Sequence, residues 1–332
     1  MKILLSSYAY APRIGGIETS SVLLAREFVA AGHQLILVTE IPAQASPPDT
    51  FEVVRNPTLG HLGKLVRWCD VVFQNNISLR HLVPALLLGK PVLLVHQTWI
   101  RNIAGGIGWN DRIKRTLLPR VKNVAISQAI ANNIRVAAEV IGNPYDDRIF
   151  KINANIHRNR ELIFVGRLVS DKGADVLLRA LGILKIPANL TIIGRGPEEE
   201  NLRTLVRELS LDQSVTFAGE KVGPELAELM NHHQVIVIPS RSEPFGIVAL
   251  EGIACGCIAL GSERGGLTEA IGNCGVTFRN GDSEELADRL AELLRDSKMR
   301  EKFRMAAPVH LERFRAQTVA QRYLALLREL AA

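Results

Sequence analysis

Two cations in the second half of the chain stand where a strand is expected to give way to a helix. Arg167 follows the residues Phe164 to Gly166, and Lys172 lies five positions further on, directly before Gly173. Guanidinium and ammonium groups bind phosphate oxygens strongly, so two such charges at one corner could hold a diphosphate. Each residue alone would be an ordinary surface cation, and it is their joint position that indicates an anion site.

Two carboxylates flank the expected start of a helix further along the chain. Glu243 precedes Pro244, a residue suited to a first helical turn, and Glu251 follows about two turns later. Seven helical residues advance ~10 Å, which would let one carboxylate bind sugar hydroxyls while the other binds a ribose. The free N–H groups at the helix start would face a phosphate between them. A cap-region glutamate and a solvated helical glutamate would explain each residue, but not the whole arrangement.

Glycines interrupt several other strand-to-helix junctions, where they let the backbone approach a phosphate closely. Gly15-Gly16 follows the first apolar run, and Gly265-Gly266 follows a later one. A glycine pair taken alone is a weak signal, since it is often only a turn. The loop Gly194-Arg195-Gly196 resembles the beginning of a dinucleotide-binding fingerprint but lacks its third glycine. The residues that follow are Pro197-Glu198-Glu199, and carboxylates at a helix start repel a pyrophosphate.

All these residues follow short apolar runs that alternate with helical patterns along the chain. Consecutive apolar positions, as in Leu35-Ile36-Leu37-Val38, are typical of parallel strands covered on both faces. In the first half we expect strands at 2–8, 34–40, 51–56, 70–76, 91–98, 123–128 and 138–144. Helices are expected there at 17–31, 79–88 and 110–121.

The pattern restarts after a polar stretch from Asn153 to Arg160, which predicts two domains. Two doubly wound α/β domains follow from this alternation, an N-terminal one over 1–152 and a C-terminal one over 153–315. The last helix, 316–332, is expected to pack back on the first domain because its apolar residues recur at helical spacing. Second-half strands are expected at 161–168, 189–194, 214–218, 235–240, 257–262 and 274–279, and helices near 173–185, 197–210, 224–232, 246–255 and 283–296.

The composition excludes several classes of protein. The chain has 332 residues, of which 47% are hydrophobic and 22% charged, the proportions of a globular protein. Its longest apolar runs fall far short of the ~20 residues needed to cross a bilayer, and its first residues lack a signal-peptide core. We therefore expect a cytoplasmic protein. Four cysteines in a chain of this length are not a disulfide framework, and we expect buried free thiols.

The net charge of +6 lies in the first half of the chain. Residues 1–150 contain 16 Lys and Arg against 10 Asp and Glu, and the remainder is balanced. This excess is too mild and too poor in aromatic residues for a nucleic-acid platform. It would suit an anionic ligand or peripheral contact with the inner membrane surface, although a solvated helix face is the simpler explanation. Part of the excess falls on Arg112, Lys114, Arg115, Arg120 and Lys122.

Taken together, these motifs resemble those of glycosyltransferase family 4, a group of retaining enzymes that use nucleotide-diphosphate sugars. The resemblance covers nearly the whole chain and is most specific over 161–271, where Arg167, Lys172, the Glu243-to-Glu251 pair and Gly265-Gly266 match. In residues 1–150 it is looser. The resemblance implies the GT-B fold, in which two Rossmann-like domains face each other across a cleft.

The resemblance also implies roles for the residues at matching positions. Arg167 and Lys172 would hold the donor diphosphate, Glu243 the sugar hydroxyls and Glu251 the ribose. His96 would face the donor sugar near its reacting carbon. The implied catalytic residues are Arg167, Lys172, Glu243 and His96, and the implied donor-binding residues are Gly15, Gly16, Gly194, Arg195, Val222, Phe245, Gly246, Ile247 and Glu251.

By the same resemblance, the donor is a UDP- or GDP-sugar and the acceptor hydroxyl belongs to a glycan, a lipid-linked sugar or a small molecule. Retention without an enzyme nucleophile implies front-face attack, with the departing phosphate taking the acceptor's proton and no metal or other cofactor required. Two other readings are a GT-B epimerase or phosphorylase, and a dinucleotide-dependent oxidoreductase or nucleotide-binding module suggested by Gly194-Arg195-Gly196. Nucleic acid is not an expected partner.

Overall fold

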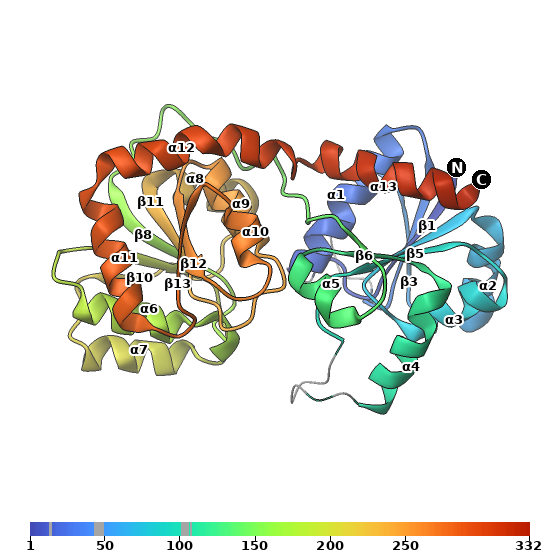
Figure 1. Ribbon diagram of the computed structural model, residues 1–332, viewed down its shortest axis with the longest axis horizontal. Helices are drawn as coiled ribbons and strands as arrows, with labels where there is room; N and C mark the ends of the chain where they lie inside the picture. Colours follow the sequence, from blue (N-terminus) through green and yellow to red (C-terminus); the bar gives the residue numbers. More distant parts are fainter. Residues whose placement is uncertain (13–14, 43–49, 101–105, 107) are drawn as a thin grey trace. The chain divides into compact units, whose positions relative to one another are not determined.

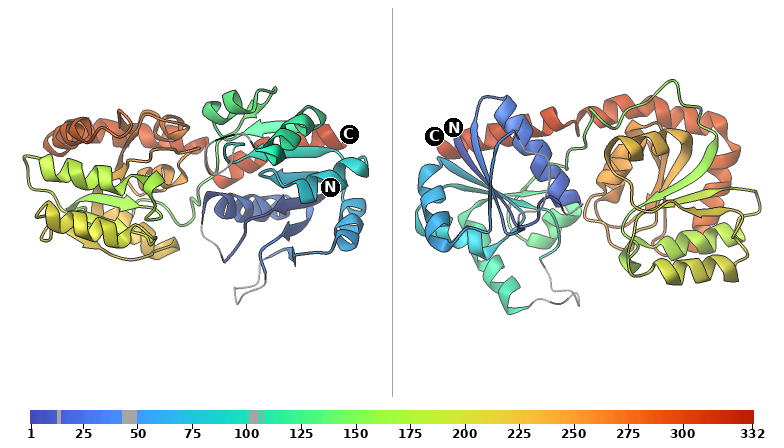
Figure 2. Two further views of the ribbon diagram at one scale, coloured as in Figure 1. Left: turned by 90° about the horizontal axis from the view of Figure 1, so that it is seen from below. Right: turned by 180° about the vertical axis from the view of Figure 1, so that it is seen from behind.

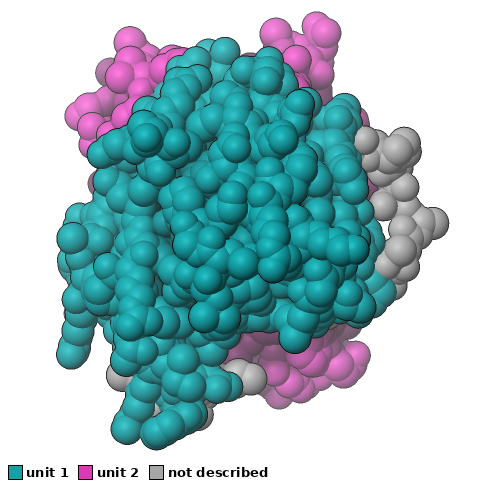
Figure 3. Space-filling view, turned by 90° about the vertical axis from the view of Figure 1, so that its right-hand side faces the viewer, with its two compact units in different colours: residues 1–145, 314–332 teal, residues 146–313 magenta. Residues whose placement is uncertain are grey.

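The chain forms two compact units, which Figure 3 colours separately. The computed structural model describes residues 1–12, 15–42, 50–100, 106 and 108–332. Unit 1 comprises Met1–Tyr145 and Phe314–Ala332, and unit 2 comprises Asp146–Arg313. The divisions thus fall within a few residues of the boundaries that the sequence predicts, after 152 and after 315. Each unit is built on one parallel sheet flanked by helices (Figures 1 and 2).

The sheet of unit 1 has seven strands among the described residues, in the order β3-β2-β1-β4-β5-β6-β7. The register pairs Ile3 with both Leu35 and Val71, so β1 is an interior strand between β2 and β4. All five residues of β5 are buried, as expected for a strand covered on both faces. The strands are β1 (Lys2–Ser7), β2 (Gln34–Thr39), β3 (Glu52–Arg55), β4 (Val71–Asn75), β5 (Val92–His96), β6 (Lys122–Ala125) and β7 (Glu139–Val140).

The helices of unit 1 divide between the two faces of its sheet. The connection from β1 to β2 steps in one direction along the sheet, whereas those from β3 to β4, β4 to β5 and β5 to β6 step in the other. Since parallel crossovers are right-handed, α1 covers one face and α2, α3 and α4 the other (Figure 1). The helices are α1 (Gly16–Ala30), α2 (Leu59–Trp68), α3 (Leu79–Leu87), α4 (Trp109–Leu117), α5 (Gln128–Ile134) and α13 (Ala316–Ala331), with a 3₁₀ turn at Leu118–Arg120.

The last helix of the chain completes the core of unit 1. Helix α13 packs against α1 and the strands β4 and β5. Its Tyr323 contacts Phe73 edge to face, with ring centroids 5.1 Å apart, and Phe73 contacts Phe28 in the same way at 5.5 Å. Aromatic pairs of this geometry are favourable beyond the area they bury. The apolar spacing of the last helix thus reflects burial in unit 1.

The sheet of unit 2 has six strands among the described residues, in the order β10-β9-β8-β11-β12-β13. From β8 the chain proceeds outward to β9 and β10, and from β11 it proceeds outward in the opposite direction. The strand order therefore reverses between β8 and β11, which is where ligands bind in open α/β sheets. The strands are β8 (Arg160–Val165), β9 (Leu190–Ile193), β10 (Val215–Phe217), β11 (His233–Ile238), β12 (Ile258–Ser262) and β13 (Gly275–Phe278).

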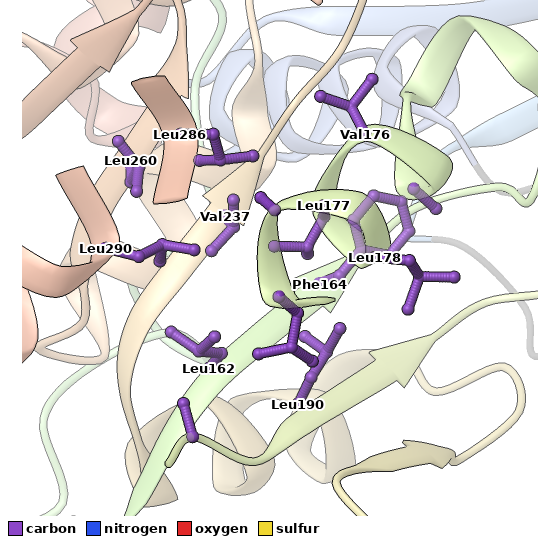
Figure 4. Close-up of a cluster of buried hydrophobic side chains, with 14 of the residues drawn as sticks. Leu162, Phe164, Val176, Leu177, Leu178, Leu190, Val237, Leu260, Leu286 and Leu290 are labelled. Carbon is purple, nitrogen blue, oxygen red and sulfur yellow. The ribbon is translucent and has the colours of Figure 1, made fainter. Parts of the chain in front are cut away.

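An aliphatic core holds the helices of unit 2 to this sheet. Figure 4 shows Phe164 and Val237 of the sheet beside Leu177 of α6 and Leu286 of α11. The four cysteines of the chain are free and buried, which confirms the prediction about them. The helices are α6 (Ala174–Ile183), α7 (Glu199–Glu208), α8 (Gly223–His232), α9 (Ile247–Ala254), α10 (Leu267–Ile271), α11 (Ser283–Arg295) and α12 (Ser297–Glu312), with a 3₁₀ turn at Ser170–Lys172.

Candidate functional site

The loops after β8 and β11 meet at the point where the strand order of unit 2 reverses. Lys172 ends the 3₁₀ turn after β8, and Glu243 lies in the loop after β11. The Lys172 Nζ donates to Glu243 Oε2 at 2.6 Å. The lysine side chain is 25% exposed and the glutamate side chain 9% exposed. Two residues that the sequence assigns to one donor site are therefore direct neighbours, 71 positions apart in the chain.

The Glu243 carboxylate is held from several sides. The Ser240 hydroxyl donates to the same oxygen at 3.2 Å, and the Ser262 hydroxyl in turn donates to the Ser240 carbonyl. The Gly266 N–H donates to the Glu243 carbonyl at 3.0 Å. A Cβ on Gly265 would lie 2.0 Å from that carbonyl oxygen, and its φ of +82° is one that side chains rarely adopt. The predicted glycine loop therefore fixes the backbone of Glu243.

An arginine and an aspartate that the sequence reading missed tie the two loops together. Both terminal nitrogens of Arg241 donate to the Asp175 carboxylate, at 2.8 and 2.7 Å, and one donates to the Ser170 carbonyl. The Arg241 N–H also donates to the Asp171 carbonyl. Burial would raise the pKa of Asp175, but the hydrogen bonds and charge of Arg241 outweigh this and lower it. Bidentate pairs of this kind fix geometry, so Arg241 positions the turn that carries Lys172.

The two predicted glycines after β9 allow close backbone packing. A Cβ on Gly194 would lie 1.9 Å from the Gly166 carbonyl oxygen, and one on Gly196 would lie 2.2 Å from that of Leu168. The Leu168 N–H donates to the Arg195 carbonyl at 2.8 Å. The loops after β8 and β9 therefore run against each other, and packing accounts for the Gly-x-Gly spacing without a dinucleotide.

Two guanidinium groups on these adjoining loops point away from the packed core. Arg167 and Arg195 are both exposed. Within the described part of the chain, neither guanidinium has a hydrogen bond or ion pair. Both are therefore available to an anion at this edge of the sheet.

Val222 lies after the outer strand β10, at the same edge of the sheet. Gly194 donates its N–H to the Gly219 carbonyl at 2.8 Å, which connects the β9 loop to the one after β10. Val222 precedes α8 as its N-cap residue and is 49% exposed, unusual for a valine. It offers an apolar surface at the end of the row of loops.

Helix α9 lies within the predicted range 246–255, but Pro244 does not belong to its first turn. Its first residue is Ile247, and Gly246 is the N-cap with a φ of +102°. Pro244 thus lies in the loop, and Phe245 is buried. The described structure gives the N-terminus of α9 no side-chain cap, which leaves amide hydrogens available to an acceptor. Only four residues of helix separate Ile247 from Glu251, an advance of ~6 Å rather than the ~10 Å predicted.

Glu251 lies one turn into α9, in a half-buried position. Desolvation raises the pKa of its carboxyl to about 7, and the nearby Asp146 carboxylate adds to the effect. A half-buried carboxyl needs a polar partner. A ligand hydroxyl would supply one.

In unit 1, the predicted glycine loop precedes α1. Gly16 is the first residue of α1, and the N-terminus has no side-chain cap in the described structure. A Cβ on Gly15 would lie 2.6 Å from Glu18 Oε2, so the Glu18 side chain lies over the loop. An anion here requires that side chain to rotate away. Behind the loop, Asn75 donates to the Ile17 carbonyl at 3.2 Å and to the Ser21 hydroxyl at 2.7 Å.

A buried amide network extends from Asn75 to the end of unit 1's first segment. The Gln97 side chain donates to Asn75 Oδ1 at 2.8 Å and to Asn143 Oδ1 at 2.9 Å. Asn143 returns a hydrogen bond to Gln97 Oε1 at 2.7 Å. All three side chains are buried. The sequence contained a signal for this network, because Asn75 and Gln97 both stand at strand ends.

The expected role of His96 has no support in the geometry of unit 1. The residue is 0% exposed, and its Nε2 lies 2.9 Å from Asn123 Oδ1. Its Nδ1 has no partner among the described residues. Burial lowers the pKa of the imidazole, which favours the neutral form. Successive strand residues face opposite sides of a sheet, so His96 packs toward Asn123 while Gln97 meets the network behind α1.

Neither a metal cluster nor a membrane-spanning helix is found in the parts of the chain that the structure covers. No three His, Cys, Asp or Glu side chains of residues 1–12, 15–42, 50–100, 106 and 108–332 gather as metal ligands would. In the same ranges, each helix is too short or too polar to cross a bilayer.

Comparison with known proteins gives a consistent result. Residues 146–310 match the family model described as "Glycosyl transferases group 1". A D-inositol 3-phosphate glycosyltransferase of Paenarthrobacter aurescens is 36% identical over 177 residues, which cover 51% of this chain and 43% of that protein. This match thus spans less than half of the relative's length. The N-acetyl-alpha-D-glucosaminyl L-malate synthase of Bacillus anthracis is 22% identical over 97% of this chain and 96% of its own length.

Two solved structures resemble this chain in fold over nearly its whole length. HepE of Anabaena, crystallised with UDP and glucose, has a TM-score of 0.82 at 21% identity, covering 99% of this chain and all of its own. Sucrose-phosphate synthase of Thermosynechococcus elongatus has a TM-score of 0.81 at 20% identity, covering 99% of this chain and 98% of that one. At these identities the likeness is one of fold.

Proposed function

We propose that this chain transfers a sugar from a nucleotide-diphosphate sugar to an acceptor hydroxyl. The chain belongs to the glycosyl transferases group 1 family through residues 146–310. It also has the GT-B fold of two Rossmann-like units. The observation that carries this proposal is the meeting of Lys172 and Glu243 at the reversal of strand order in unit 2. One side chain suits a phosphate and the other suits sugar hydroxyls.

In the proposed complex, the donor separates the Lys172–Glu243 ion pair. The ammonium turns to the diphosphate, and the carboxylate accepts hydrogen bonds from the transferred sugar. Arg167, whose guanidinium is exposed and unpaired among the described residues, adds a second positive charge. Each charge then has a ligand partner in place of a protein partner, which keeps the site satisfied in both states.

The nucleoside occupies the neighbouring surface in this proposal. Glu251 accepts hydrogen bonds from the ribose hydroxyls, which suits a half-buried carboxyl. The uncapped N-terminus of α9 at Gly246 and Ile247 donates to the phosphates, since a helix N-terminus favours negative charge. Arg195 and the exposed Val222 lie along the same row of loops and contact the base side of the donor. Gly15 and Gly16 of unit 1 stay predicted donor residues.

We propose a retaining, front-face reaction. The bond between the sugar's anomeric carbon and the phosphate oxygen breaks, and a bond from that carbon to the acceptor oxygen forms on the same face. The departing phosphate oxygen takes the acceptor's proton. Arg167 and Lys172 stabilise the negative charge that develops on the leaving nucleoside diphosphate, which is why no metal ion is required in this scheme. Catalysis then consists of positioning and leaving-group stabilisation.

The donor can be identified by thermal shift, in which the melting temperature of the protein is measured with UDP-sugars, GDP-sugars and NAD. A ligand at 100 times its dissociation constant stabilises the folded state by ~2.7 kcal/mol, so the true donor raises the melting temperature and NAD does not. Arg167→Met should abolish the shift, whereas Arg295→Met, the loss of an exposed arginine on α11, should not. Stabilisation by NAD alone would contradict the proposal.

Transfer itself is tested with the donor so identified and a set of glycan, lipid-linked and small-molecule acceptors. We expect nucleoside diphosphate release that depends on the acceptor and persists in a chelator. Nuclear magnetic resonance of the product should show the anomeric configuration of the donor. Inverted product would refute the front-face scheme, and loss of activity in chelator would refute metal independence.

A further inference from the structure

The positive charge of this protein is concentrated in one segment that is almost free of carboxylates. Residues 53–138 contain 12 Lys and Arg but only two acidic residues, Asp70 and Asp111. The rest of the chain contains 28 Lys and Arg against 32 Asp and Glu, so this segment supplies more than the whole net charge. A surface made of it attracts anions.

Both acidic residues of the segment are already engaged. Asp70 Oδ2 accepts the Lys2 N–H at 2.7 Å, next to the central strand. Asp111 is buried, where it accepts the Gly108 N–H at 3.0 Å at the start of α4 and lies 3.7 Å from Lys114 Nζ. Asp111 is therefore balanced within unit 1, and Asp70 is the one exposed carboxylate among the described residues of the segment.

The segment also forms one face of unit 1. Its helices are α2, α3, α4 and α5, which cover the same side of the sheet because their crossovers step in the same direction. Helices α2 and α3 pack against each other. The opposite face is occupied by α1 and α13 and contains none of this segment's helices.

The helices of this face carry exposed apolar side chains. Unit 1 has five large apolar side chains that are exposed, considering the residues described, and all five lie on α2, α3 or α4. They are Leu59, Val83, Leu87, Trp109 and Ile113. Leu59, Val83, Pro84 and Leu87 border an open groove of about 570 Å³ between α2 and α3, where Arg80 is the one polar residue among the described lining.

Exposed cations without a partner among the described residues lie on two of these helices and directly after α4. Lys64 and Arg67 of α2, Arg112 of α4 and Arg120 after it are exposed and form no hydrogen bond or ion pair with another described residue. Arg115, which the sequence grouped with this basic cluster, is instead held by the carbonyls of Ile100 and Asn133. The basic surface is therefore wider than the cluster at 112–122 and includes α2.

We propose that the α2–α4 face of unit 1 docks on an anionic lipid bilayer. Exposed leucines and a tryptophan on a face that also carries exposed lysines and arginines are the combination found on interfacial helices, whose apolar side chains enter the acyl boundary while the cations meet the headgroups. Nucleic acid fits less well, because one exposed tryptophan gives no stacking platform and aliphatic side chains gain nothing on phosphates. This surface is separate from the proposed donor site in unit 2 and does not depend on its chemistry.

Vesicle co-sedimentation of the full chain tests the proposal without any donor or acceptor. We expect binding to phosphatidylcholine vesicles that contain phosphatidylglycerol, and little binding to phosphatidylcholine alone. Raising the salt from about 0.1 M to 1 M shortens the Debye length from about 10 to 3 Å and should weaken binding. Each cation near an anionic surface changes partitioning roughly five-fold, so Lys64→Gln with Arg67→Gln should lower it by an order of magnitude or more.

Matched controls on unit 2 separate this face from general stickiness. Leu87 and Val309 are each 81% exposed, and Trp109 and Met305 are each 75% exposed. Leu87→Ser and Trp109→Ser should weaken vesicle binding several-fold, whereas Val309→Ser and Met305→Ser should leave it unchanged. Equal binding to both kinds of vesicle, equal loss in the control variants, or binding of a short DNA duplex that competes with vesicles would overturn the proposal.

Discussion

The ion pair between Lys172 and Glu243 predicts a measurable energetic coupling in unit 2. At 2.6 Å, with both side chains mostly buried, it is a charge-assisted hydrogen bond. Such bonds contribute about 1.5–3 kcal/mol net, and Lys172→Met leaves the Glu243 carboxylate with only the Ser240 hydroxyl as a polar hydrogen-bond partner among the described residues. We expect this substitution to lower the free energy of unfolding by about 2–3 kcal/mol. Combining it with Glu243→Gln should cost less than the sum of the two single changes.

The assay must report on unit 2. The three tryptophans of the chain, Trp68, Trp99 and Trp109, all belong to unit 1. Urea unfolding followed by far-ultraviolet circular dichroism, with hydrogen exchange of peptides from 160–280, is therefore suitable. As a control, the exposed pair Arg289–Glu292 should show coupling below about 0.5 kcal/mol in the same cycle. Additive effects at Lys172 and Glu243 would refute the reasoning.

Three more perturbations test other parts of the structure. Gly265→Ala should lower the free energy of unfolding by more than about 2 kcal/mol, because the new Cβ would meet a carbonyl oxygen. Gly219→Ala, at φ +69° with open space around it, should lower it by about 1 kcal/mol. Equal urea midpoints of the two variants would contradict this. The pKa of Glu251 is about 7 in the native state against an ordinary value of 4.5. The native state therefore binds more protons between these values, and stability falls as the pH rises through them. Glu251→Gln should abolish that fall in urea midpoints, and an unchanged pH slope would count against it. Gln97→Leu leaves the buried Asn143 amide without its hydrogen-bond partner and should lower the free energy of unfolding by about 2–3 kcal/mol. Urea unfolding followed by tryptophan fluorescence measures this loss, and a variant as stable as the original protein would contradict the prediction.

Strand positions in both units could be predicted from the sequence because buried parallel strands are apolar at consecutive positions. Each predicted strand overlaps an observed one, although β7 is only Glu139–Val140 where 138–144 was predicted. Four helices lie outside the predicted ranges, namely α2, α5, α10 and α12, and α10 has only five residues. The segment of α2 contains Gly60 and Gly63, and that of α12 contains Pro308, residues that disfavour helix locally and are overridden by packing. Helix α5, with seven residues, is too short for its period to be recognised.

The candidate site could be predicted as far as its loops, but not its side-chain pairing. Residues after parallel strands share one edge of a sheet, which is why Arg167, Lys172 and Glu243 could be grouped without coordinates. The direct Lys172–Glu243 bond and the Arg241–Asp175 clamp depend on distances that no sequence pattern specifies. The orientation of the His96 side chain could not be predicted. Its strand is apolar at consecutive positions, so no alternation indicates which face of the sheet a side chain takes.

The chain leaves unit 1 after Tyr145 and returns to it at Phe314, and these two residues are joined by a hydrogen bond from the Tyr145 N–H to the Phe314 carbonyl at 3.1 Å. Unit 2 is therefore an uninterrupted segment inserted into its partner. During synthesis unit 2 can finish folding while the first segment of unit 1 still lacks α13. In that state Phe73 has not yet made its contact with Tyr323. That interval is when the nascent chain most needs protection from aggregation, and it ends only once residues 314–332 have been made.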